Sequence, residues 1–188
     1  MSDVEKRSSG AVASSPAQRT GLSPWIAGGV AAGVLGLSAL VGRRNAPDRS
    51  HPRIRRWYRS LDKPAYTPPD AVFGAVWPGL ESLAAVGGYR LLRQPSSPRR
   101  DAAVALWFAN SAMIGGWTEL FFRKRQTGPS AAAAGAMAAG TSALAAIAWK
   151  VDRPAAVSVI PLAGWLGFAT MLSSDIWQRN GQQSRAAT

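Results

Sequence analysis

Three stretches of 21 residues contain no charged side chain, and they restrict the possible folds more than any other feature. They are residues 22–42, 129–149 and 154–174. A helix of about 20 apolar residues crosses the hydrocarbon core of a bilayer. Two further apolar runs, residues 71–89 and 102–122, contain one acid each, Glu81 and Glu119. The sequence therefore predicts an all-α bundle of five transmembrane helices.

A soluble bundle with Ala-rich core helices is the alternative interpretation. The mean hydropathy of −0.04 fits a soluble protein. That average is low because apolar and charged residues are segregated along the chain, with short basic loops between the apolar runs. Segregation of this kind is typical of membrane proteins.

The predicted domain organisation is simple. Residues 1–20 are rich in Ser, Ala and charge and are predicted to form a disordered tail. Residues 21–180 form the transmembrane domain, and residues 181–188 form a polar tail. A signal peptide is the competing interpretation of the first run, but the run is long and 20 polar residues precede it.

The chain carries 22 Lys and Arg against 10 Asp and Glu, which first suggests a nucleic-acid partner. Nearly all the basic residues lie outside the apolar runs, however, and aromatic residues do not alternate with them as in single-strand binders. The loops after the first and third runs and the C-terminus contain 13 of the basic residues, and the other side contains 9. This bias predicts a cytoplasmic C-terminus and an N-terminus outside.

Several chemistries lack the residues that they need. The chain has no cysteine, and its one histidine, His51, lies in a basic loop. Disulfides, thiolate metal sites and Ser-His-Asp catalysis are therefore not expected. We predict no metal and no required cofactor.

Small residues recur at four-residue spacing in three of the predicted helices. The pairs are Gly29 and Gly33, Ala32 and Gly36, Ser111 and Gly115, and Ala136 and Gly140. Small residues at this spacing let helices approach closely in lipid. They predict tight helix packing and a possible homodimer.

Three tryptophans lie well inside the apolar runs rather than at their ends. They are Trp77, Trp117 and Trp165, and each shares a helical face with other aromatic or apolar residues. Aromatic rings that face the interior of a bundle could form the walls of a slot for a flat apolar ligand. Ordinary helix packing explains the same periodicity and is the simpler interpretation of these faces alone.

Three stretches of the sequence together resemble the TspO/MBR family of tryptophan-rich sensory and translocator proteins. They are WYRSLDKPAYTPPDAVFGAVWPGL from residue 57, WTELFFRKRQTG from residue 117 and PLAGWLGFATMLSSDIWQRN from residue 161. The resemblance covers residues 57–180 and implies a TspO-like fold of five helices. It also implies that a porphyrin, such as protoporphyrin IX or a heme-like molecule, binds between the helices, with sterols or synthetic ligands in some members.

The loop at residues 63–69, KPAYTPP, is expected to be stiff, since proline fixes φ and keeps the preceding residue extended. The resemblance implies that this loop closes over the pocket. The residues that match the family's pocket, or share its helical faces, are predicted to bind the ligand: Tyr66, Phe73, Trp77, Glu81, Asn110, Ile114, Trp117, Trp165, Ala169 and Leu172.

The chain departs from the family pattern in the polar part of this pocket. Tyr66 replaces the usual lid tryptophan, and Glu81 replaces a tyrosine. Ser174 stands where the sterol-recognition pattern needs a tyrosine, so sterol binding is not expected. Glu81 is predicted to lie near the pocket, whereas Glu119 is predicted to reach the membrane interface.

The favoured function is porphyrin binding of the sensory or transport type. Two alternatives remain at this point. The first is an enzyme that degrades protoporphyrin in light, in which the resemblance would give Trp77 and Trp165 the catalytic role. The second is a structural membrane protein whose partner is another protein.

Overall fold

The computed structural model describes residues 20–186, and within them the chain is helical and has no strand. The elements are α1 (Pro24–Asn45), α2 (Pro52–Ser60), α3 (Asp70–Arg93), α4 (Pro98–Thr118), the π-helical turn η1 (Glu119–Arg123), α5 (Thr127–Ala148) and α6 (Arg153–Ala186). The all-α prediction is confirmed. The predicted disordered tail lies outside the described residues, apart from Thr20.

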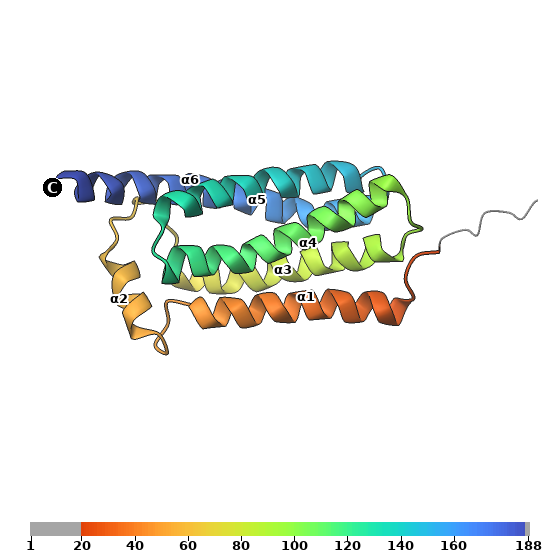
Figure 1. Cartoon of the computed structure of the whole chain (residues 1–188), viewed down its shortest axis with the longest axis horizontal. Coiled ribbons are helices and arrows are strands. Elements are labelled where there is room, and N and C mark those ends of the chain that lie inside the picture. Colours follow the sequence, from red (N-terminus) through yellow and green to blue (C-terminus); the bar gives the residue numbers. More distant parts are fainter. Residues whose placement is uncertain (1–19, 187–188) are drawn as a thin grey trace, which may run out of the picture.

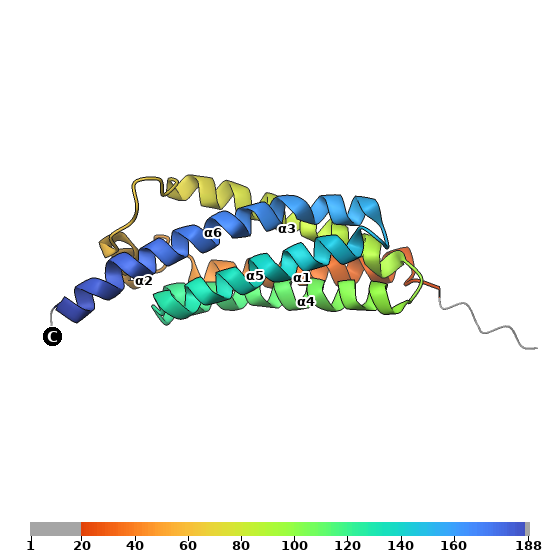
Figure 2. The same ribbon diagram turned by 90° about the horizontal axis from the view of Figure 1, so that it is seen from above.

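Five long helices run side by side along the molecule, and the short helix α2 lies across one end of them (Figure 1). The view from above shows the same arrangement, with α3 beside α6 and α5 beside α4 (Figure 2). The C-terminal end of α6 lies at the α2 end, whereas α1 begins at the opposite end. The described part of the chain therefore places the connection after α1, the connection after η1 and the end of α6 on one side, as the charge count assumed.

Four of the helices are long and apolar enough to cross a membrane: α1, α3, α5 and α6. The helix α4 is not among them; its first turn carries Arg99, Arg100 and Asp101, and the polar Asn110 lies near its middle. A bundle of membrane-spanning helices is thus supported. The count of five spans stays a prediction.

The sequence interpretation missed α2. It treated the whole basic stretch around residues 43–70 as a connection, but Pro52 begins a helix of nine residues there. Ile54, Trp57 and Tyr58 lie on the inner face of α2, and the Tyr58 side chain is buried. Spacings of three and four residues place these side chains on one face of a helix, so the amphipathic pattern was present in the sequence.

The π-helical turn changes how α4 ends. The Lys124 amide donates to the Glu119 carbonyl at 3.0 Å, which is a bond across five residues instead of four. Arg125 follows with a φ of 56°, a left-handed conformation that ends the helix. The turn places Phe121 inside the bundle, where 2% of its surface is exposed, against the rings of α2.

The centre of the bundle depends on close contact between α3 and α4. Trp107 is almost fully buried, and its ring lies against the backbone of Gly88. A Cβ atom at Gly88 would lie only 2.1 Å from Cε2 of Trp107. Only glycine leaves room for this indole.

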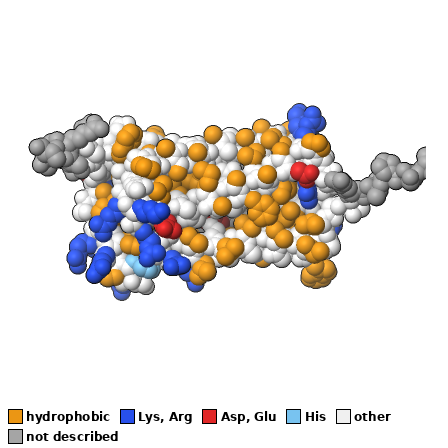
Figure 3. Space-filling view, in the orientation of Figure 1, with side chains coloured by type: hydrophobic (Ala, Val, Ile, Leu, Met, Phe, Trp, Pro, Cys, Tyr) orange, Lys and Arg blue, Asp and Glu red, His pale blue; other side chains and the backbone are white. Residues whose placement is uncertain are grey.

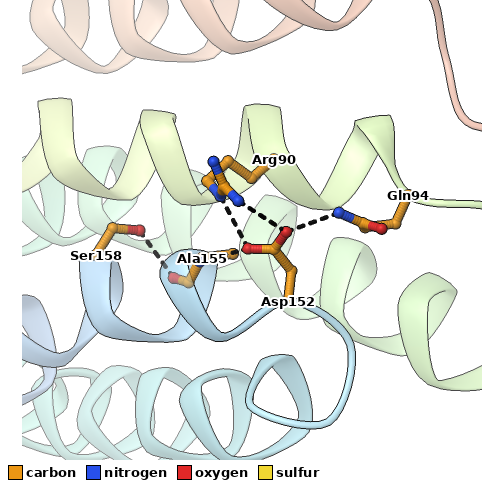
Figure 4. Close-up of polar contacts among 5 residues, drawn as sticks. All are labelled: Arg90, Gln94, Asp152, Ala155 and Ser158. Carbon is orange, nitrogen blue, oxygen red and sulfur yellow. Dashed lines mark hydrogen bonds and ion pairs between the residues drawn. The ribbon is translucent and has the colours of Figure 1, made fainter.

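One buried carboxylate fixes the end of the bundle opposite α2 (Figure 4). Asp152, which is 6% exposed, accepts hydrogen bonds from Arg90 Nε at 2.8 Å and from Gln94 Nε2 at 2.7 Å. It also accepts from the Ala155 amide at 2.8 Å and so caps the start of α6. This carboxylate ties α3 to the first turn of α6.

The small-residue pairs have two different environments. Gly115 of α4 faces Val41 of α1, and Gly140 of α5 faces Asn110 of α4, so these glycines serve packing within the bundle. Within the described chain, Gly29 and Gly33 of α1 have no atom of another element within 4 Å of the position where a Cβ would lie. The predicted homodimer contact is therefore not tested by the structure of one chain.

Candidate functional site

The loop at residues 61–69 is fastened to the last part of α6. The Asp62 amide donates to Asn180 Oδ1, and Asn180 Nδ2 donates back to the Asp62 carbonyl, both at 3.0 Å. Farther along the loop, the Tyr66 hydroxyl donates to Asp175 Oδ2 at 2.6 Å. Two separate points of the loop are thus held by one helix.

The loop is also stiff by itself. The amide and the hydroxyl of Thr67 both donate to the Pro64 carbonyl, at 2.9 and 2.7 Å. Pro64 is buried, and Pro68 and Pro69 lead directly into α3. These contacts agree with the expected stiffness of KPAYTPP.

The loop also contacts α2 through Lys63. Its ammonium group donates to the Tyr58 carbonyl at 2.6 Å and lies 4.1 Å from the centre of the Tyr58 ring. Burial, followed by the nearby Asp70 carboxylate, raises the pKa of Tyr58 to about 12. Tyr58 therefore stays neutral under this loop at any physiological pH.

Five aromatic side chains from the loop, α3 and α6 contact one another, and we call them the loop-side aromatic cluster: Tyr66, Phe73, Trp77, Trp165 and Phe168. Trp165 of α6 is their centre, with ring centroids 5.8 Å from Phe73, 6.4 Å from Trp77 and 5.3 Å from Phe168. Tyr66 contacts Phe168 at 6.3 Å. The cluster joins the loop, α3 and α6, so a flat ligand can enter it only by separating these rings.

The indole nitrogen of Trp165 is the polar feature of this cluster. It is buried and has no hydrogen-bond partner among the described residues. Leaving a buried donor unpaired costs about 1–3 kcal/mol. A ligand with an acceptor atom at this point would satisfy the donor.

Trp117 belongs to a neighbouring group of rings. It stacks on Phe121 with centroids 4.9 Å apart, and its indole N–H donates to the Ser130 carbonyl at 2.8 Å. Leu172 of α6 is buried between the two groups, because Phe73, Phe168 and Trp117 pack on the same small cluster. Ala169 lies one turn after Trp165 and is partly buried.

The structure does not bring the remaining predicted residues to the loop-side aromatic cluster. Glu81 and Ile114 line a cavity of about 20 Å³ between α1, α3 and α4, bordered also by Ser38 and Ser111. A cavity of this size holds one water molecule and no larger ligand. Asn110 is buried against Gly140 of α5 and donates to the Leu106 carbonyl.

Two residues of this region were not among the predicted site residues. Phe168 is part of the loop-side aromatic cluster, and its periodicity with Trp165 was the available signal. Asp175 holds Tyr66, but no sequence pattern indicates that pairing. Among the described residues, no group of three or more His, Cys, Asp or Glu side chains could hold a metal ion.

The chain is similar in sequence to several known proteins. The translocator protein of Ovis aries is 36% identical over 131 residues, which cover 66% of this chain and 75% of the relative. The translocator protein of Homo sapiens is 31% identical over 128 residues, with the same shares covered. The tryptophan-rich sensory protein of Cereibacter sphaeroides is 27% identical over 130 residues, which cover 69% of this chain and 80% of that protein.

The sequence model of the TspO/MBR family matches residues 29–178, a region that contains α2, the loop and the loop-side aromatic cluster. The apolar helices independently indicate several membrane spans. The chain is therefore a multi-pass membrane protein that belongs to the TspO/MBR family.

Proposed function

We propose that the protein binds a porphyrin, or a similar flat tetrapyrrole, between α3 and α6 beneath the loop at residues 61–69. The observation that carries this proposal is Trp165, whose buried indole N–H has no partner in the described part of the chain and whose ring contacts three other aromatic rings. Aromatic walls suit a flat conjugated ligand, and a buried donor suits an acceptor on it. A binding function of the sensory or transport type needs such a ligand site and no further chemistry at it.

The prolines inside α3 and α6 support a site that opens. Pro78 follows Trp77 directly, and Pro161 lies one turn before Trp165. A proline inside a helix removes one backbone hydrogen bond and makes bending easier at that point. The rings of the loop-side aromatic cluster can then separate without unfolding either helix.

The proposal includes the orientation in the membrane. We propose five spans, with α4 as the fifth, because α4 packs between α1 and α5 along the bundle. The larger number of basic residues at the α2 end favours a cytoplasmic position for that end. A reporter enzyme that works only in the cytoplasm should be active when it is fused after residue 188. Activity of a reporter that works only outside the cytoplasm would reverse the proposed orientation.

The decisive experiment is a titration of the purified protein with protoporphyrin IX in the dark, in which tryptophan fluorescence is the measured signal. Binding should quench the fluorescence, and the W165F variant should bind more weakly because it loses the indole donor. The matched control is W25F, since Trp25 is 89% exposed near the start of α1. Equal loss of affinity in W165F and W25F would reject the site.

A second candidate function is degradation of the bound porphyrin in light. The edge-to-face contact between Trp77 and Trp165, with centroids 6.4 Å apart, favours it because both rings would touch one ligand. Illumination of the complex should then yield a modified tetrapyrrole. The W77F and W165F variants should both lose this product, and an unchanged rate in both would exclude a role for the two indoles.

A further inference from the structure

Positive charge is concentrated at the α2 end of the molecule. Seven arginines lie between residues 43 and 59, and Asp48 is the one acid in that stretch. Figure 3 shows Lys and Arg side chains gathered around α2, with few acidic side chains among them on this face. This surface carries much more positive charge than is needed to balance its acids.

The acids of the described residues do not form ion pairs with these arginines. Asp48 accepts hydrogen bonds from the Ser50 amide at 2.8 Å and lies 3.2 Å from His51 Nδ1. Within the described residues, none of the seven arginines forms an ion pair with an acid. At the opposite end, by contrast, Arg90 pairs with Asp152 and Arg100 pairs with Asp101.

The helix α2 separates its aromatic and basic residues onto different faces. Trp57 and Tyr58 pack on Phe121 of η1, with ring centroids 5.5 and 6.4 Å away. Arg53, Arg56 and Arg59 follow one another at three-residue spacing and are all exposed. They form a basic ridge on the side of α2 that does not contact the bundle.

The helix α2 lies just beyond the end of the candidate membrane span α1, so we expect its ridge at the level of the lipid headgroups. The membrane-spanning helix α1 ends at Asn45, and α2 begins at Pro52 and lies across the end of the bundle (Figure 1). The polar layer on each side of the hydrocarbon core is roughly 5–8 Å thick. The aromatic face of α2 is occupied by the protein itself, which leaves the arginines on the other face free to meet charged groups of this layer.

We propose that the outer face of α2, with Arg53, Arg56 and Arg59, binds the phosphate groups of anionic phospholipids. A guanidinium group donates two parallel hydrogen bonds to a phosphate and needs little dehydration. Each basic residue near an anionic membrane surface strengthens binding by about fivefold. This surface is separate from the porphyrin site, so the lipid would be a second kind of ligand.

The test uses the full chain, purified in an uncharged detergent without porphyrin. Fluorescent phosphatidylglycerol and phosphatidylcholine are titrated separately, and affinity is measured by fluorescence anisotropy. The parent protein should bind phosphatidylglycerol at least about tenfold more tightly than phosphatidylcholine, and this preference should weaken at high salt. Equal affinity for the two lipids would overturn the proposal.

The R53Q/R56Q/R59Q variant should lose about tenfold or more in affinity for phosphatidylglycerol. The matched control is R99Q/K150Q/R153Q, which removes three exposed charges at the opposite end and should change affinity by less than about twofold. An equal loss in both variants would mean that net charge alone attracts the lipid, and would overturn the site. Circular dichroism and thermal melting should show that both variants fold, since none of the six residues forms an ion pair in the described part of the chain.

Two competitors test whether the ridge binds a lipid headgroup or a soluble anion. Soluble glycerol phosphate and a short single-stranded RNA are added to the complex with phosphatidylglycerol. Neither should displace the lipid at equal concentration, because neither lies in the micelle beside α2. Displacement by either one would show that the ridge serves a soluble anion instead.

Discussion

The hydroxyl group of Tyr66 donates a hydrogen bond of 2.6 Å to Asp175, and this bond holds the middle of the loop against α6. The Tyr66 ring is 43% exposed, so the bond stands at the edge of the bundle. The Y66F variant should keep the ring contact with Phe168 but lose this bond. We expect porphyrin to dissociate faster from Y66F, with little change in melting temperature. Stopped-flow dissociation rates test this, and an unchanged rate would mean that the Asp62–Asn180 contact alone closes the loop.

The same bond predicts a pH dependence. The hydrogen bond to Asp175, followed by burial, raises the pKa of Tyr66, because the neutral hydroxyl is the donor. The loop contact is therefore fully present below the ordinary tyrosine pKa of about 10 and is lost as the pH rises through the higher folded-state value. Porphyrin dissociation should accelerate in that alkaline range for the parent protein, while Y66F should lack this step.

Trp165 should be stabilising when a ligand is bound and slightly destabilising when none is. Its buried indole donor has no partner among residues 20–186, so W165F removes an unsatisfied group from the ligand-free protein. The melting temperature of ligand-free W165F should therefore stay level or rise. The increase in melting temperature on adding protoporphyrin IX should be smaller than for the parent. A large loss of stability in the ligand-free variant would show that the indole makes a structural contact instead.

Gly88 and Gly79 provide a paired test of the α3–α4 contact. A Cβ at Gly88 would collide with the ring of Trp107 at 2.1 Å, whereas no other element of the described structure comes within 4 Å of that position at Gly79. We expect G88A to destabilise the protein by about 1–3 kcal/mol or more, since the core cannot admit an extra methyl group. G79A should be neutral or slightly stabilising, because alanine favours a helix. Thermal melting in detergent measures both.

Asp152 should contribute to stability above acidic pH. Burial alone would raise its pKa, but hydrogen bonds from Arg90, the Ala155 amide and Gln94 outweigh burial and hold the pKa below its ordinary value. The contribution is therefore present above the unfolded-state pKa of about 3.9 and is lost as the pH falls through the lower folded-state value. D152N should cost about 1.5–3 kcal/mol at neutral pH. The control D48N changes an exposed acid and should melt close to the parent.

The position of Glu81 is where the sequence prediction and the structure differ most clearly. It lies four residues after Trp77, and that spacing predicted a shared role in the pocket. In the folded chain Trp77 contacts Trp165 of α6, whereas Glu81 borders the small cavity with Ser38 of α1. We therefore expect E81A to leave porphyrin affinity unchanged. A clear loss of affinity in E81A, measured by fluorescence quenching, would restore Glu81 to the site.

Local patterns predicted the long helices well, because a charge-free run of about 20 residues has few other possible structures. They placed the aromatic residues of α3 on one face of that helix, did the same for α6, and predicted a stiff loop at residues 63–69. Contacts between distant segments had no such signal. Nothing in the sequence indicates that Asp175 holds Tyr66, or that Asn110 fits against Gly140. These contacts depend on how far each helix is rotated, which periodicity does not determine.

The length of α6 has a mechanical consequence. Its 34 residues, at about 1.5 Å each, make a rod of roughly 51 Å, well beyond the hydrocarbon core of about 30 Å. Pro161 lies near the start of this rod, Trp165 about 6 Å farther along, and Asn180 about 29 Å from the proline. Any swing of the rod about Pro161 moves Asn180 about five times as far as Trp165. Asn180 holds Asp62 of the loop by two hydrogen bonds. A shift of a fraction of an ångström at Trp165 would therefore move this end of the loop about five times as far.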